Sequence, residues 1–216
     1  MFNIFKRKIE RIAGIERKTT ETEINCILNI DGKGKAQIDT GIGFLDHMLE
    51  LFVFHGLLDL KLKVIKSDLK VDTHHTNEDV GIVLGQTFKK ALGNMKGIRR
   101  FGSASAPMES VLASVTLDIS GRSHFTGIIS RFGLETAKKE EDYTIEDANH
   151  FFESFAKQSG VNIIIKTENP GQLAPGMVDI HTVLEPVFKA FGIALNQATG
   201  IDPHRQGIPS TKGVID

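Results

Sequence analysis

The stretches Asp72-Thr-His74-His75-Thr-Asn-Glu78 and Asp179-Ile-His181-Thr182-Val-Leu-Glu185 are two versions of one pattern, and they decide how the chain is organised. In each, a histidine and a glutamate four residues apart share one face of a helix. The second histidine of the first stretch points about 100° away from that face, so one helix can offer metal ligands in two directions. Threonine replaces this outward histidine in the second stretch.

The sequence before the first stretch and around it has the spacing of alternating strands and helices. The first two strands are separated by Asp31-Gly-Lys-Gly34, which predicts a tight turn and therefore a hairpin. Apolar residues recur every three or four positions in the helices and alternate with lysine in the third strand. The expected elements are strands at 24–30, 35–38 and 58–65, a helix at 43–54, and a helix that begins at Thr76 or Asn77 and ends at Leu92.

The second half of the chain repeats this plan. Pro186 is tolerated only in the first turn of a helix, so we expect the last helix to begin close to Thr182. The expected elements are strands at 111–119, 125–129 and 161–166 and helices at 146–158 and 182–197. Because the same order of elements surrounds both copies of the pattern, we expect a duplicated unit.

The predicted fold class is α+β: two duplicated halves, each a β-sheet with helices on one face, packed as a pseudo-twofold unit. We expect an N-terminal extension at 1–14, a first half at 15–100 and a second half at 101–216. Each half alone would have a marginal core, so the halves should pack together and leave apolar surface for oligomers.

Composition limits the function classes. The net charge of −1 argues against nucleic acid or an anionic membrane surface as a partner. No apolar run approaches the ~20 residues that span a bilayer. The single cysteine, Cys26, cannot form an internal disulfide, and the N-terminus does not read as a signal peptide, so we expect a cytoplasmic protein.

Spacing alone makes His74, His75 and Glu78 the strongest metal-ligand candidates. His181 and Glu185 keep the same separation, whereas threonine is no substitute for imidazole as a donor to a divalent ion. Nitrogen and carboxylate donors suit manganese, iron or zinc, and six-coordination favours manganese. His150 lies on another predicted helix, from which it could replace a lost ligand, although a solvated histidine is the simpler interpretation.

Several further motifs, in order along the chain, resemble imidazoleglycerol-phosphate dehydratases of histidine biosynthesis. The resemblance covers about residues 15–215. It rests on Arg17-Lys-Thr-Thr-Glu21-Thr, Thr40-Gly-Ile-Gly-Phe-Leu-Asp46-His47-Met-Leu, the stretch that begins at Asp72, Gly97-Ile-Arg-Arg100-Phe-Gly, Asp118-Ile-Ser-Gly-Arg122, Phe188-Lys189-Ala-Phe and Pro209-Ser210-Thr-Lys212-Gly.

The resemblance implies a hydro-lyase that dehydrates imidazoleglycerol phosphate to imidazole-acetol phosphate through an imidazolate intermediate. It implies one or two Mn²⁺ ions per subunit, ligands shared between subunits, and a homo-oligomer of 24 subunits built from trimers. The implied metal ligands are His47, His74, His75, Glu78, His181 and Glu185. The implied substrate-binding residues are Glu21, Arg100, Arg122, Lys189, Ser210 and Lys212, and the implied catalytic carboxylates are Glu185, Glu21 and Glu78, with Glu185 or Glu21 as the base.

The chain departs from the family pattern mainly in its second half. Thr182 and Ile164 stand where the family has histidines, and Ser110 stands where it has glutamate. These changes leave a second hypothesis open: a diverged homologue that binds metal and phosphate but has altered or lost catalysis. A mononuclear metallohydrolase that uses His74, His75 and Glu78 is a third, although it leaves the basic motifs unexplained.

Overall fold

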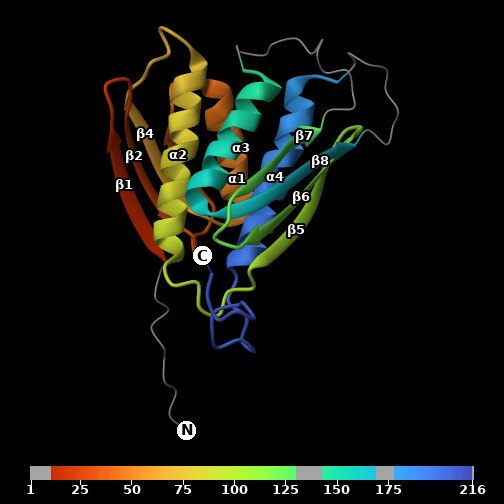
Figure 1. Ribbon diagram of the computed structural model, residues 1–216. Coiled ribbons are helices and arrows are strands. Elements are labelled where there is room, and N and C mark those ends of the chain that lie inside the picture. Colours follow the sequence, from red (N-terminus) through yellow and green to blue (C-terminus); the bar gives the residue numbers. More distant parts are fainter. Residues whose placement is uncertain (1–10, 130–142, 169–177, 216) are drawn as a thin grey trace.

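Two four-stranded sheets enclose four helices in the computed structural model of the chain (Figure 1), which describes residues 11–129, 143–168 and 178–215. The first half contains β1 (Ile12–Lys18), β2 (Glu23–Asn29), β3 (Lys35–Asp39), α1 (Gly43–Gly56), β4 (Asp59–Lys66) and α2 (Thr73–Leu92). The second half contains β5 (Phe101–Met108), β6 (Val111–Ile119), β7 (His124–Ile129), α3 (Ile145–Ser159), β8 (Val161–Glu168) and α4 (Ile180–Thr199).

The two sheets have the same topology, which confirms the duplication. Their strand orders are β1-β2-β4-β3 and β5-β6-β8-β7, and in each sheet only the last pair is parallel. The predicted hairpin between β2 and β3 is wrong, because β4 lies between them. The turn at Asp31 does reverse the chain, but the returning strand pairs with β4 in parallel rather than with β2.

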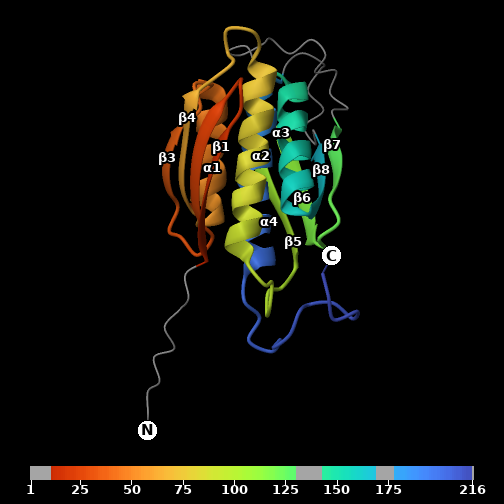
Figure 2. The same ribbon diagram turned by 60° about the vertical axis from the view of Figure 1, so that its left-hand side comes forward.

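The core lies between the sheets and is shared by both halves. Alternate residues of each central strand are buried, as in the β2 residues Ile24, Cys26 and Leu28, because successive side chains point to opposite faces. α1 and α2 cover the first sheet and α3 and α4 the second, and the two helix layers pack as α1 on α4 and α2 on α3 (Figure 2). Both of these helix–helix contacts therefore join the first half to the second.

Glycines permit both of these helix contacts. A Cβ atom at Gly192 of α4 would lie 2.4 Å from the carbonyl oxygen of Phe52 in α1. A Cβ atom at Gly85 of α2 would lie 2.7 Å from the carbonyl oxygen of Phe155 in α3. Since both obstacles are backbone atoms, a larger residue would force the helices apart.

Helix beginnings differ from the predictions for local reasons. α2 begins at Thr73 because the side chain of Asp72 accepts a hydrogen bond from the His74 amide at 3.1 Å. α4 begins at Ile180, so Pro186 lies inside the helix rather than in its first turn.

The edge strands β1 and β5 were not predicted, and β1 starts within the segment expected to be an extension. Residues 1–10 of that segment lie outside the described residues. No helix among the described residues combines the length and apolarity needed to cross a bilayer.

Candidate functional site

α1 and α4 together form a cluster of His47, His181 and Glu185, which we call the first cluster. The Nε2 atom of His181 lies 2.8 Å from Oε2 of Glu185, and Nε2 of His47 lies 3.7 Å from the same oxygen. One donor atom from each residue falls within 4.8 Å of the other two. The spacing of His181 and Glu185 predicted their proximity, whereas His47 joins them only through the packing of α1 on α4.

Glu185 is held in the ionised form. Burial alone would raise its pKa, but hydrogen bonds from Lys189 and then from His181 outweigh burial, so the pKa lies below its ordinary value. Its Oε1 atom accepts from the Lys189 ammonium one helical turn away. Lys189, predicted as a substrate-binding residue, is therefore already paired with the candidate metal ligand.

α2 and α3 form the second cluster, which consists of His74, Glu78 and His150. The Nδ1 atoms of His74 and His150 are 2.9 Å apart, and their ring centroids are 4.4 Å apart. Glu78 is looser, with its Oε2 atom 3.9 Å from Nε2 of His74. His150 is half-buried and in contact with His74, which favours the interpretation that it acts with the α2 residues over that of a solvated histidine. It lies in the second turn of α3, as His47 lies in the second turn of α1. Symmetry between the halves was the signal that could have found it.

The outward histidine of the α2 pair belongs to a third group with Glu21 and Asp68. Nδ1 of His75 lies 2.8 Å from Oδ2 of Asp68, and this hydrogen bond raises the pKa of His75. If Asp68 accepts from Nδ1, the Nε2 lone pair of His75 is free to bind a metal.

Glu21 stands on the exposed turn between β1 and β2, and buried polar contacts hold that turn against α2. The hydroxyl of Thr22 donates to Asp79, and an Arg17 guanidinium nitrogen lies 2.7 Å from the same Asp79 carboxylate oxygen. Asp79 directly follows Glu78 on α2. These contacts anchor the turn that carries Glu21 against α2, on the side where His75 lies.

The second half has no matching outward group among the described residues. Thr182 is buried at 6 % exposure, and its backbone amide donates to the N-cap Asp179 at 2.6 Å. Ile164 is 38 % exposed and offers no donor. Within the described ranges, the buried hydroxyl of Ser110 has no hydrogen-bond partner. The two halves therefore match in their inward clusters and differ in what faces outward.

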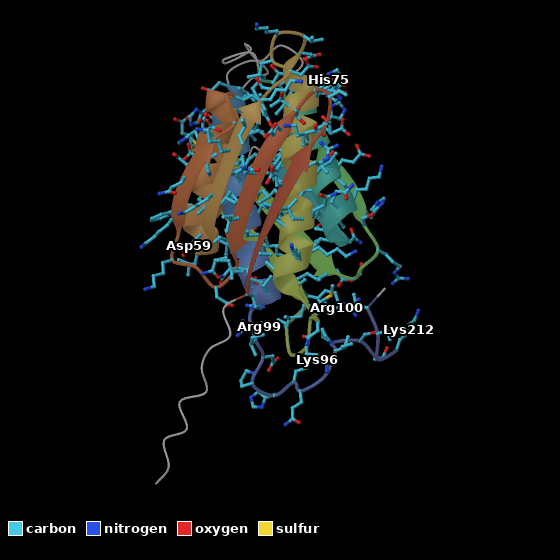
Figure 3. The ribbon with its side chains drawn as sticks, turned by 90° about the vertical axis from the view of Figure 1, so that its left-hand side faces the viewer. Asp59, His75, Lys96, Arg99, Arg100 and Lys212 are labelled. Atoms are coloured by element: carbon cyan, nitrogen blue, oxygen red, sulfur yellow. The ribbon has the colours of Figure 1, made fainter. Side chains whose placement is uncertain are left out.

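Most of the basic candidates lie at the opposite end of the molecule. Figure 3 places His75 at one end and Arg100 and Lys212 at the other. Arg100 donates to both oxygens of Asp118, at 2.6 and 3.0 Å, and to the carbonyl of Pro209 at 3.0 Å. It therefore holds the C-terminal segment in place, with two of its five N–H groups left over.

The other basic candidates lie beside this segment or in a nearby turn. The Lys212 amide donates to the Ser210 hydroxyl at 3.2 Å, while the Lys212 side chain is exposed. Arg122 is an exposed residue in the turn between β6 and β7. These residues offer cations and a hydroxyl, which suit a phosphate.

Comparisons with known proteins agree on one family. The imidazoleglycerol-phosphate dehydratase family model matches residues 40–195. Imidazoleglycerol-phosphate dehydratases of Pelobacter propionicus and Clostridium acetobutylicum are 45% and 47% identical over 205 and 209 residues, covering 95% of this chain and 99% and 98% of theirs. The crystal structure of the Staphylococcus aureus dehydratase matches with a TM-score of 0.73 at 29% identity, covering 88% of this chain and 99% of that one. The Pyrococcus furiosus enzyme, in complex with (S)-C348, matches at 0.73 and 30%, covering 93% and 99%.

Proposed function

The chain belongs to the imidazoleglycerol-phosphate dehydratase family, and from this membership we propose that it is the hydro-lyase that converts imidazoleglycerol phosphate into imidazole-acetol phosphate in histidine biosynthesis. The carrying observation is the first cluster, in which two histidines and a glutamate from two helices each bring one donor atom within 4.8 Å of the other two. This arrangement is suited to holding an imidazole-binding metal. The proposal extends to a cytoplasmic location.

The donor sets fit Mn²⁺, which we propose as the cofactor. His47, His181 and Glu185 would hold one ion, because one donor atom of each lies within 4.8 Å of the other two. Among the described residues, the other group that could hold an ion is His75 with Asp68 and Glu21. When bound, the metal supplies Lewis acidity that favours the imidazolate form of the substrate ring.

The dehydration also needs a base for the carbon next to the one that loses hydroxide. Both carboxylate oxygens of Glu185 already have partners in His181 and Lys189, and Glu78 faces His74. We therefore assign the base to Glu21, which stands on an exposed turn beside His75. Glu21 takes the C–H proton, the C–O bond on the adjoining carbon breaks and the hydroxyl leaves as hydroxide, which gives an enol. The hydroxide and the proton from Glu21 together make one water molecule, and the enol tautomerises to the ketone.

A complete site would require more than one copy of the chain. The twenty residues of α2 rise ~1.5 Å each and separate His75, near one end, from Arg100, which follows the other. A substrate with a three-carbon side chain is much shorter than the resulting ~30 Å. We therefore propose that the basic end of one copy meets the histidine end of another, within the 24-subunit homo-oligomer of trimers that the family pattern implies.

The missing donors of the second half support one alternative, a diverged homologue with weakened catalysis. In a chain with histidines at positions 164 and 182, each histidine would supply a metal donor to a neighbouring copy. Ile164 and Thr182 would remove these two donors. Manganese content per chain and turnover of imidazoleglycerol phosphate separate the two functions. We expect two ions and turnover in the wild type.

Single-histidine variants then test the two groups. We expect one ion fewer than the wild type in His47→Ala and in His75→Ala, and no loss in His204→Ala, an exposed histidine in the C-terminal segment. Folded, metal-loaded protein without turnover would overturn the enzyme assignment. Unchanged metal content in both His47→Ala and His75→Ala would overturn the metal centres.

A further inference from the structure

The turn between β1 and β2, which carries Glu21, is closed by hydrogen bonds of its own residues. The Thr19 hydroxyl accepts from the amides of Glu21 and Thr22, at 3.1 and 2.9 Å. The Thr19 amide donates to the carbonyl of Thr22 at 2.8 Å. The Lys66 ammonium of β4 donates to the carbonyl of Thr20. Because the turn is closed in this way, the position of the exposed Glu21 follows that of the fully buried Thr22.

One carboxylate oxygen of α2 holds both sides of this turn. The Thr22 hydroxyl donates to Oδ2 of Asp79, and the Arg17 guanidinium lies 2.7 Å from the same oxygen. Asp79 is only 9 % exposed, and a carboxylate at that depth requires such partners. Because Arg17 precedes Glu21 in the chain and Thr22 follows it, the turn is fixed to α2 on either side of Glu21.

Asp79 lies on the face of α2 that carries His75. The two residues are four apart, and residues at that spacing are neighbours on one helix face. His75 in turn converges with Glu21 and Asp68, with one donor atom of each within 4.8 Å of the others. α2 also holds Asp68, because the Thr76 hydroxyl accepts from the Asp68 amide at 3.1 Å. One helix therefore sets the position of every member of this group.

A carboxylate that takes a proton from carbon must lie within hydrogen-bond reach of that proton. A displacement of ~1 Å can lower the rate ~100-fold. Apolar side chains of the same shape could fill the space between Thr22 and Asp79 with little loss of stability, but only a hydrogen bond constrains direction and separation. We propose that Thr22 and Asp79 are positioning residues that hold Glu21 where it can take the C–H proton. The inference rests on the proposed function, because it takes Glu21 as the base of the dehydration.

The first test measures kcat and KM for imidazoleglycerol phosphate with the full chain supplied with Mn²⁺. Thr22→Val removes the hydroxyl and keeps the shape of the side chain, whereas Thr22→Ser keeps the hydroxyl. We expect kcat to fall ~10–100-fold in Thr22→Val, with a smaller change in KM, and to return toward the wild type in Thr22→Ser. Asp79→Ala removes the acceptor itself and should lower kcat at least as much, which provides a second test should Thr22→Val fold poorly. An unchanged kcat in either folded variant would overturn the inference.

A Glu21→Gln background tests whether the contact acts through Glu21. Substitutions that act through one group are not additive, whereas independent ones are. In Glu21→Gln, the further change Thr22→Val should lower the residual kcat by less than about 2-fold. An equal loss of kcat in the Glu21→Gln and wild-type backgrounds would assign the effect to the fold in general and overturn the inference.

Hydrogen exchange measures the turn independently of activity. The amides of residues 17–23 should exchange ~2–10-fold faster in Thr22→Val, as expected for the loss of one buried hydrogen bond. They should exchange at the wild-type rate in Glu21→Gln, because the Glu21 side chain is exposed. Unchanged exchange in Thr22→Val would mean that the contact does not hold the turn, and would also overturn the inference.

A matched control makes the same chemical change further along α2. Thr87 is fully buried, and its hydroxyl donates to the carbonyl of Val83 at 2.7 Å. Thr87→Val should leave kcat and the exchange of residues 17–23 unchanged; a loss of kcat equal to that of Thr22→Val would overturn the inference alone. Absence of turnover in the wild type would instead refute the proposed function and, with it, the role of Glu21 as the base.

Discussion

Gly192→Ala should loosen the contact between α1 and α4 and, with it, the first cluster. The added methyl carbon would lie 2.4 Å from the carbonyl oxygen of Phe52 and 2.9 Å from the amide nitrogen of Gly56. Comfortable contacts begin at ~3.5 Å, and neither obstacle is a flexible side chain. The two helices must therefore separate by about 1 Å.

The free-energy change has two opposing parts. Alanine in a helix interior is favoured over glycine by about 1 kcal/mol, whereas overpacking against a rigid neighbour costs about 1–3 kcal/mol. Because the added methyl group meets backbone atoms, we expect the upper end of that range and a net decrease of about 2 kcal/mol in the free energy of unfolding. For a chain of this size that lowers the melting temperature by about 4–8 °C.

The same displacement should weaken metal binding, because His47 is on α1 while His181 and Glu185 are on α4. Thermal melts in EDTA measure the stability part. Mn²⁺ titration in a His75→Ala background, which removes a donor from the other candidate group, measures the first cluster. Gly207→Ala is the control, since a Cβ atom there would meet nothing within 4 Å. A Gly192→Ala protein that melts with the control and binds Mn²⁺ normally would refute the reasoning.

Four further outcomes follow from the same structure. Gly85→Ala should lower the melting temperature and leave Mn²⁺ binding at the first cluster unchanged, because its clash of 2.7 Å is with a carbonyl oxygen of α3; thermal melts in EDTA and Mn²⁺ titration decide it. Asp68→Asn should return the pKa of His75 toward its ordinary value, because the Asp68 carboxylate is the main cause of the rise; NMR titration measures the pKa, and an unchanged value would contradict the contact. Burial raises the pKa of the Cys26 thiol from 9.0 to about 12. The neutral thiol therefore contributes its full stabilisation of the fold below pH 9, and the free energy of unfolding should fall as the pH rises toward 12. Alkylation of Cys26 by N-ethylmaleimide at pH 8 should require unfolding. Thr182→His should increase metal content per chain while overpacking its buried site by about 1–3 kcal/mol, and unchanged metal content would place residue 182 away from any metal.

The sequence predicts elements well where one face is clearly apolar. The helix expected at 43–54 is α1, and the strand expected at 161–166 lies within β8. β5 was missed because Phe101–Met108 is rich in glycine, serine and alanine, which have low strand propensity. Its pairing with β6 and its cover by α4 supply what local preference lacks. The order in which the strands pair is likewise set by non-local contacts, which is why the turn at Asp31 wrongly predicted a hairpin.

The residues of the candidate site also divide into those that local spacing predicts and those that depend on contacts between distant segments. Residues four apart on one helix, such as His181 and Glu185, could be placed together from spacing alone. His47 and His150 join their clusters through contacts between helices from opposite halves, and the sequence does not encode such contacts locally. The family resemblance supplied His47. The sequence offered His150 only as a possible substitute for a lost ligand, and the fold places it against His74.

The shared origin of each cluster has a consequence for ancestry. The first cluster combines α1 with α4 and the second combines α2 with α3, so neither half of the chain holds a cluster by itself. A half-length ancestor could have built these clusters only as a twofold dimer, and its two clusters would have been identical. Fusion of two such genes would remove that constraint, because each copy could then mutate alone. His75 and Thr182 mark a position where the two copies have separated.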